Sequence, residues 1–307
     1  MKDRTAWALF FSLIAISGIL FSIMVILDFI HAGSDGVYSI SVIMRSPGDR
    51  FTKGMEQAAL DYNVDVHAVS GFDPGNGPQQ IEYLQRELDN YTDAVIIDPE
   101  DPESLAAYLD NGRPRAPVVT VIQPLPGNEA VCHVGADDAE LGRILGEWIA
   151  GGPGGQCMII APKTGFKPLH RTRTDAVKQA LDSAGVLYEV RYANADSADI
   201  AAEISGEQYT SVAVIDENML GFVCEAVKPS AGIYGIGYTG MVRAYLESGR
   251  IKGLAVYSDY DAGYLSVRAA VEAAGKKAAG GAVLTAYKVT AENMYQDPIV
   301  FVLFPIG

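Results

Sequence analysis

Short apolar runs alternate with helical patterns from residue 37 almost to the end of this 307-residue chain. The first run, residues 37–44, precedes a segment in which Phe51, Met55 and Ala58 recur at the spacing of one helix face. Alternation of this kind is typical of βαβ units, in which parallel strands form a sheet with helices on its faces. We therefore predict an α/β fold with parallel sheets. The other predicted strands are residues 64–69, 94–98, 117–122, 130–134, 156–161, 188–192, 211–216, 233–237, 251–257 and 283–289.

A cluster of glycines at residues 151–155 separates two similar series of these units. Because the cluster precedes a strand and not a helix, it is typical of a surface turn and not of a phosphate-binding loop. The strand-and-helix cycle begins again at Gln156, and no long polar linker lies between the two series. The sequence therefore predicts two α/β lobes that are joined by short crossings of the chain.

Residues 6–30 form an almost unbroken apolar run, whose only acid, Asp28, lies near its far end. A helix rises about 1.5 Å per residue, so about 20 apolar residues cross a hydrocarbon core of about 30 Å. Lys2 and Arg4 precede the run, which keeps the short N-terminus in the cytoplasm and exports the remainder. We predict a single-pass signal-anchor in the cell membrane with an extracytoplasmic C-terminal domain. A cleaved signal peptide, with its cleavage site near residues 30–32, is the open alternative.

The formal net charge of −15 opposes binding to nucleic acid, because a phosphate-reading protein needs a basic face. Cys132, Cys157 and Cys224 lie in or beside apolar runs without C-x-x-C spacing, which favours buried free thiols over disulfides or zinc. The distance from the apolar run to the first of them also argues against a lipoprotein. No metal-ligand spacing or nucleophile elbow occurs, so we predict no metal, no cofactor and no enzyme, and catalysis is a remote alternative.

Polar residues stand where the predicted strands end. In open α/β sheets, ligands bind beyond the carboxyl ends of the strands, and side chains of this kind suit a small polar ligand. The predicted ligand-binding residues are Arg45, Asp49, Gln123, Asp137, Arg171, Asp216, Tyr238 and Tyr257. The same strand ends also carry Arg50, Asp98, Lys163, Lys167, His170, Arg173, Glu217, Asn218, Thr239, Ser258 and Asp259.

Several of these positions have a purely structural alternative. Asp137 and Asp216 stand where a helix N-cap is expected, and Asp98 stands in a turn before proline. Arg171 fits a solvated helix face as well as a ligand site, and Tyr257 fits core packing.

The order of short motifs along the chain resembles the type I periplasmic sugar-binding proteins, which include ribose-, galactose- and xylose-binding proteins, and the effector domains of lactose-repressor-like regulators. The motifs are Phe51-x-x-Gly54, Ala94-Val-Ile-Ile-Asp98, His133-Val-Gly-Ala-Asp137, Arg171-Thr-Arg173, Val214-Ile-Asp216-Glu217, Gly235-Ile-Gly237-Tyr238 and Leu246-x-Ser-Gly249. The resemblance implies two Rossmann-like lobes joined by three hinge crossings, which close around a ligand. It places the first lobe at residues 36–136 plus 258–285 and the second at 137–257 plus 286–307, after an N-terminal stub and anchor at 1–35.

The sugar contacts of the family transfer to this chain only in part. Gln123 stands where ribose-binding proteins carry the first residue of an Asp-Arg pair, and Thr239 stands at an expected aspartate. Tyr257 replaces the glutamine of the last crossing, whereas Arg171 stands where a ligand arginine of the family stands. Arg171 and Arg45 in one cleft would also suit a carboxylate or a phosphate.

We therefore predict an anchored solute-binding protein for a small polar ligand, which is a sugar or a sugar derivative. Its partner is a sensor kinase or an ABC permease. Anchored relatives that act as kinase co-receptors favour the sensor. A ligand-free interaction module on the same fold is the alternative from another class, while a transcription factor would need a DNA-binding headpiece where residues 6–30 lie.

Overall fold

The computed structural model describes residues 37–112, 114–127, 132–164, 167–204, 208–228, 230–277 and 280–305. The predicted membrane anchor at residues 6–30 lies outside this part of the chain. Within it, no helix is both long and apolar enough to span a membrane. Residues 39–307 form one compact unit, which holds both sheets.

The first sheet has six strands in the order β11-β5-β4-β3-β1-β2, and every neighbouring pair is parallel. The central strands of such a sheet are buried on both faces, whereas the edge strand β2 carries the exposed Asp65 and the partly buried His67. All four residues of β3 are buried, for example. The strands are β1 (Ser39–Ile43), β2 (Asp65–Val69), β3 (Ala94–Ile97), β4 (Val118–Val121), β5 (Cys132–Ala136) and β11 (Ala282–Leu284).

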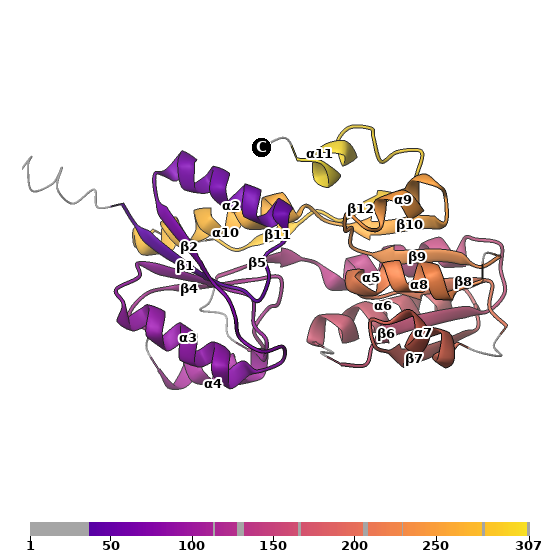
Figure 1. Ribbon diagram of the computed structural model, residues 1–307, viewed down its shortest axis with the longest axis horizontal. Helices are drawn as coiled ribbons and strands as arrows, with labels where there is room; N and C mark the ends of the chain where they lie inside the picture. The colour runs from indigo at the N-terminus through magenta and orange to yellow at the C-terminus, as the bar shows by residue number, and fades with distance from the viewer. Residues whose placement is uncertain are drawn as a thin grey trace, which may run out of the picture. The chain divides into compact units, whose positions relative to one another are not determined.

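Four helices cover the first sheet. In Figure 1, α2 (Asp49–Tyr62) and α10 (Asp259–Ala274) lie on one face, and α3 (Gly77–Asp89) and α4 (Pro102–Asn111) lie on the other. The core divides in the same way, because alternate strand residues point to opposite faces. One cluster joins the sheet to α2 and α10, and another joins it to α3 and α4.

The second sheet has the order β12-β10-β9-β8-β6-β7, and it is parallel except for β12, which runs antiparallel to β10. The α/β class with largely parallel sheets is therefore confirmed. The strands are β6 (Cys157–Pro162), β7 (Tyr188–Ala193), β8 (Ser211–Val214), β9 (Gly232–Ile236), β10 (Ile251–Val256) and β12 (Tyr287–Val289).

Helices α5 (Asp138–Ala150) and α6 (Pro168–Ser183) share one core cluster with the second sheet. The remaining elements belong to the cluster on the other face. They are α7 (Ser197–Glu203), the 3-10 turn η1 (Glu217–Met219), α8 (Leu220–Ala226), α9 (Arg243–Glu247) and α11 (Ile299–Leu303).

The chain passes between the two sheets three times: between β5 and α5, between β10 and α10, and between β11 and β12. The last passage corrects one prediction. Residues 283–289 were predicted to form a single strand, but they are two strands in different sheets, and Thr285 and Ala286 lie between them. Figure 1 shows this segment giving β11 to one sheet and β12 to the other.

Two glycines set the spacing of α2 and α10. A Cβ atom on Gly54 would overlap with the carbonyl oxygen of Tyr260, and one on Gly263 would overlap with the carbonyl oxygen of Phe51. The two backbones therefore approach more closely than larger residues would allow. As a result, the first turn of α2 lies beside the first turn of α10, which positions side chains of both turns at the same site.

Candidate ligand-binding site

A cavity of about 500 Å³ lies where the carboxyl ends of strands from both sheets meet. The first sheet contributes the loops after β1, β3 and β4. The second contributes the N-terminal ends of α6 and η1 and the loop after β9, and the crossing from β10 into α10 completes the lining. Its volume falls in the range of about 300 to 1,000 Å³ that is typical of small-molecule sites.

Five of the eight predicted ligand-binding residues line this cavity. They are Arg45, Asp49, Asp216, Tyr238 and Tyr257. They come from the loop after β1, the first turn of α2, the start of η1, the loop after β9 and the end of β10. The polar residues at the strand ends therefore lie mostly at one cavity, and the contact of each with a ligand stays a prediction.

Arg171 lies outside the lining and is exposed, whereas Arg173 is buried and lines the cavity. Successive residues of a helix are rotated by about 100°, so side chains two positions apart point to nearly opposite sides. In α6 the buried positions Leu169, Arg173 and Val177 follow one another at intervals of four residues. The structure therefore brings Arg173, and not Arg171, to the cavity wall.

Asp137 is also outside the lining. It is exposed and caps α5, accepting a hydrogen bond from the backbone N–H of Glu140 at 3.0 Å, as the structural alternative predicted. Gln123 is completely buried, and its amide oxygen and nitrogen find no hydrogen-bond partner in the described part of the chain. It does not line the cavity.

The residue before Gln123 lines the cavity in its place. Ile122 has φ 64°, and the N–H of Gln123 donates to the carbonyl oxygen of Val121 at 2.7 Å, which closes a tight three-residue turn. A β-branched residue rarely adopts a positive φ, and such conformations store of order 1–3 kcal/mol of strain. No sequence signal predicts this turn.

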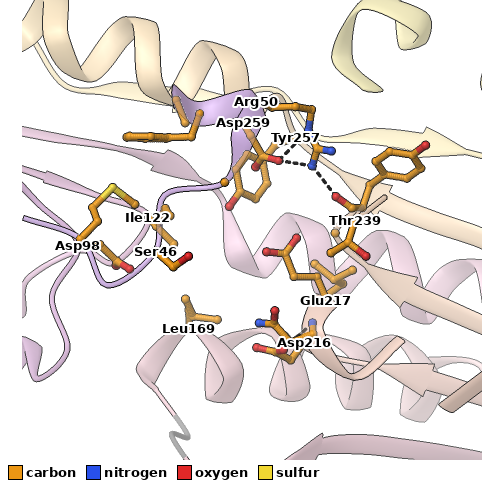
Figure 2. Close-up of a pocket in the computed structure, with 18 of the residues that line it drawn as sticks. Ser46, Arg50, Asp98, Ile122, Leu169, Asp216, Glu217, Thr239, Tyr257 and Asp259 are labelled. Carbon is orange, nitrogen blue, oxygen red and sulfur yellow. Dashed lines mark hydrogen bonds and ion pairs between the residues drawn. The ribbon is translucent and has the colours of Figure 1, made fainter. Parts of the chain in front are cut away.

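Arg50 joins three elements at the cavity (Figure 2). Its Nε donates to Asp259 Oδ2 at 3.0 Å, and its Nη2 contacts the same oxygen and the carbonyl oxygen of Tyr238. Its guanidinium also lies 5.2 Å from the centre of the Tyr238 ring. The first turns of α2 and α10 are thus tied to the loop after β9, which belongs to the other sheet.

His170 orients Asp216. The backbone N–H of Lys167 donates to His170 Nδ1 at 2.9 Å, so in the neutral ring the proton is on Nε2, which lies 2.9 Å from Asp216 Oδ2. Asp216 also accepts from the N–H of Asn218 at 2.8 Å. Burial alone would raise the pKa of Asp216, but its interactions, first of all the hydrogen bond with His170, outweigh burial and lower the pKa.

Lys167 reaches across to the first sheet. Its Nζ lies 3.8 Å from Asp98 Oδ2 and 3.8 Å from Glu100 Oε1, and it donates to the carbonyl oxygen of Pro99 at 3.3 Å. Asp98 Oδ1 is buried and has no hydrogen-bond partner among the described residues. Burial, with a smaller effect of Glu100, raises the pKa of Asp98 to about 6 in spite of Lys167.

Arg173 forms a buried ion pair beneath the cavity. Its Nε lies 2.7 Å from Asp138 Oδ1, with both side chains no more than 10% exposed, and its Nη1 donates to the carbonyl oxygen of Ile215 at 3.3 Å. Such a pair is costly to break from one side, because it leaves a buried charge alone. The guanidinium of Arg173 therefore mainly stabilises the cavity wall, because part of its hydrogen-bond donors already contact Asp138 and Ile215.

Glu217, next to Asp216, is in a different environment. Burial, together with the negative charges of Asp259 and Asp216, raises its pKa to about 7. Figure 2 shows Glu217 and Asp216 on one side of the cavity, with Arg50, Asp259 and Tyr257 on the other. Glu217, Arg50, Arg173 and Asp98 all stand at strand ends in the sequence, but the interactions that distinguish them are not visible there.

The described residues include no group of three or more His, Cys, Asp or Glu side chains that could hold a metal ion. The three cysteines are free, and Cys157 and Cys224 are buried as predicted, while Cys132 is partly exposed. Burial raises the pKa of the Cys157 thiol to about 11 and that of Cys224 to about 12, so both stay protonated.

The family model described as a periplasmic binding protein domain matches residues 40–278, and the chain belongs to this family. The family resemblance seen in the sequence is therefore confirmed. None of the curated proteins compared with the chain gives a significant match.

Solved structures with similar folds are solute-binding proteins. A carbohydrate transporter solute-binding protein from Agrobacterium radiobacter, in complex with D-arabinose, is 18% identical, with a TM-score of 0.78 over 88% of this chain and 99% of that one. An ABC transporter solute-binding protein from Agrobacterium vitis, bound to α-D-tagatopyranose, is 16% identical, with a TM-score of 0.75 over 87% and 99%. One from Bacillus halodurans with bound myo-inositol is 20% identical, with a TM-score of 0.74 over 85% and 97%. At these identities the likeness concerns the fold.

Proposed function

We propose that this chain is an extracytoplasmic solute-binding protein that closes around a small polar ligand, which is a sugar or a sugar derivative. The observation that carries the proposal is the cavity of about 500 Å³ at the strand ends, lined by polar side chains from both sheets. The similar structures from Agrobacterium and Bacillus, which hold D-arabinose, tagatose and myo-inositol, support the same class of ligand.

Closure would take place about the three passages between the sheets. We keep the two lobes as residues 36–136 plus 258–285 and 137–257 plus 286–307. Three short connections between two rigid sheets are the kind of hinge that absorbs a domain closure. Contacts of Arg50 with the Tyr238 carbonyl and of Lys167 with Asp98 cross between the lobes and would form on closing.

The ligand contacts proposed are those of the lining residues. Arg45, Asp49, Asp216, Tyr238 and Tyr257 are retained from the sequence. Glu217 is added because its carboxyl group faces the cavity (Figure 2). The lining offers hydroxyl, carboxyl and guanidinium groups, which can pair the hydroxyls of a polyol once water is excluded.

Residues 6–30 would tether the lobes to the membrane as an uncleaved helix. A tethered receptor can hand its ligand to an ABC permease or present its closed form to a sensor kinase. The names of the similar structures from Agrobacterium, which are transporter solute-binding proteins, support the permease. The apolar run is the feature that favours the sensor. The family consists of binding proteins, so we propose no catalytic role.

Thermal unfolding of the full-length chain in a mild detergent tests the proposal. The panel comprises pentoses, hexoses, polyols, sugar acids, phosphosugars and amino acids. A ligand at about 100 times its dissociation constant adds about 2.7 kcal/mol to the folded state and raises the melting temperature by roughly 5 °C. No shift with any member of the panel would contradict the proposal and favour the ligand-free interaction module.

Two variants link the shift to the cavity. Asp216→Asn removes a lining charge and is expected to reduce the shift, whereas Arg171→Ala changes an exposed residue outside the lining and is expected to retain it. The opposite pattern would place the ligand at a different site.

A further inference from the structure

The charges around the cavity are unequal in number. Five carboxyl groups and four permanently cationic side chains line it. The carboxyl groups are those of Asp49, Asp98, Asp216, Glu217 and Asp259, and the cations are Arg45, Arg50, Lys167 and Arg173. Two further carboxylates, Glu100 and Asp138, pair from behind with three of these cations. An anionic ligand would therefore meet an excess of negative charge.

The four cations already have carboxylate partners. Arg173 pairs with Asp138, Arg50 with Asp259, and Lys167 with two acids; the Nε of Arg45 lies 3.7 Å from a carboxylate oxygen of Glu100. A paired guanidinium or ammonium group has fewer free donors for a carboxylate or phosphate. These pairings favour a ligand without a negative charge over the anionic ligand that Arg45 and Arg171 left open in the sequence.

Glu217 differs from the other partly buried acids of the lining. No cation among the described residues forms an ion pair with it, whereas Asp98, Asp216 and Asp259 each have a basic partner within 4 Å. Its carboxyl group packs over Gly237, which has φ 92°, and a Cβ atom there would lie 2.6 Å from Glu217 Oε2. A glycine thus provides both the loop conformation and the space for this carboxyl group.

We propose that the ligand is a sugar or polyol that carries a protonated amine, and that Glu217 receives this amine. The inference rests on the proposed function and narrows its class of ligand. An ammonium group would supply the counter-charge that Glu217 lacks and would relieve its repulsion with Asp259. It offers three hydrogen-bond donors, so it can also reach neighbouring acceptors such as Asp216.

Proton release separates this ligand from a neutral sugar. Without a ligand, burial and the nearby acids hold the pKa of Glu217 at about 7, so a large part of the molecules carry the proton at neutral pH. A cation beside the carboxyl group favours its ionised form. An amine is therefore expected to expel this proton on binding, and a neutral sugar brings no charge that would do so.

Isothermal titration calorimetry on the full-length chain tests the proposal with matched probes: D-glucose against D-glucosamine, and D-galactose against D-galactosamine. Titrations near pH 6.5 in two buffers of different ionisation enthalpy count the protons released. In at least one pair, the amino sugar is expected to bind about tenfold more tightly or better, a difference of about 1.4 kcal/mol, and to release up to one proton.

Glu217→Gln is expected to abolish both the preference and the proton release. Glu56→Gln, which removes an exposed carboxylate on α2, is the matched control and should keep both. Tighter binding of the neutral sugars, of glucose 6-phosphate or of glucuronate would overturn the inference and leave the proposed function standing. The same holds if the preference persists in Glu217→Gln. Failure of every probe in the wider panel would overturn both.

Discussion

Removal of the Glu217 carboxyl group is expected to stabilise the ligand-free protein at pH 8. Burial, with Asp259 and Asp216 nearby, raises the pKa of Glu217 from its ordinary 4.5 to about 7 in the folded chain. A folded state that binds a proton more tightly than the unfolded chain gains stability in acid and loses it as the pH rises. The contribution of Glu217 is therefore fully present below pH 4.5 and is lost as the pH rises through 7.

The size of the effect follows from the two pKa values. One pKa unit corresponds to about 1.4 kcal/mol, so the rise from 4.5 to about 7 gives about 3 kcal/mol as an upper limit. For a chain of this size that is roughly 6 °C in melting temperature. Thermal unfolding of the natural chain and of Glu217→Gln between pH 5 and pH 8 measures it.

The two curves are expected to lie close together at pH 5 and to separate toward pH 8, with Glu217→Gln the more stable. Asp259 interacts with Glu217 and titrates differently in the variant, so the difference between the curves reports Glu217 together with its effect on Asp259. Glu56→Gln should follow the natural chain throughout, because its charge is exposed to water. A constant difference from pH 5 to pH 8, or one that grows toward acid, would refute the reasoning.

Three further predictions concern the scaffold, and each is checked by denaturant unfolding. Gly54→Ala is expected to lose about 1–3 kcal/mol because its new methyl group overlaps with the α10 backbone, while Gly280→Ala, which meets nothing within 4 Å, is expected to change little. Gln123→Leu is expected to gain about 1 kcal/mol by removing a buried amide without partners, and a loss would show that the amide is satisfied in solution. Burial alone would raise the pKa of Glu87, but its hydrogen bonds, of which that with His67 has the largest effect, lower the pKa. Glu87→Gln should therefore reduce the free energy of unfolding by about 1–3 kcal/mol at pH 7, and by less as the pH falls toward 4. An equal cost at both pH values would contradict this assignment.

The fold could be predicted because its signal is periodic and repeated. Ten of the predicted runs overlap one strand each of the structure, and the eleventh, residues 283–289, overlaps two. β11 and β12 have only three residues each, so the apolar content of residues 283–289 does not show that the two strands belong to different sheets. Helices α9 and α11 have five residues each and were not predicted, because a five-residue helix barely exceeds one turn and shows no period.

The site could be predicted at the level of strand ends and not at the level of side chains. The family resemblance points to Arg171, although the spacing of Leu169, Val177 and Leu181 already predicts that Arg173 lies on the buried face of the helix. That signal was present in the sequence. The positive φ of Ile122 and the pairings of the cavity's charges were not, because they depend on residues that are far apart in the chain.

Asp216 and Glu217 show why the fold alone does not identify a ligand. They are neighbours at the start of η1, and burial acts on both. His170, held by the backbone of Lys167, keeps Asp216 ionised, whereas Glu217 has two acids near it and its pKa is raised. Two adjacent carboxyl groups therefore offer a ligand different chemistry: one is a fixed acceptor, and the other carries a proton that a suitable cation can displace. A related chain with the same backbone and a different residue at position 170 or 217 would lose this distinction, so the class of ligand follows from these side chains and their partners.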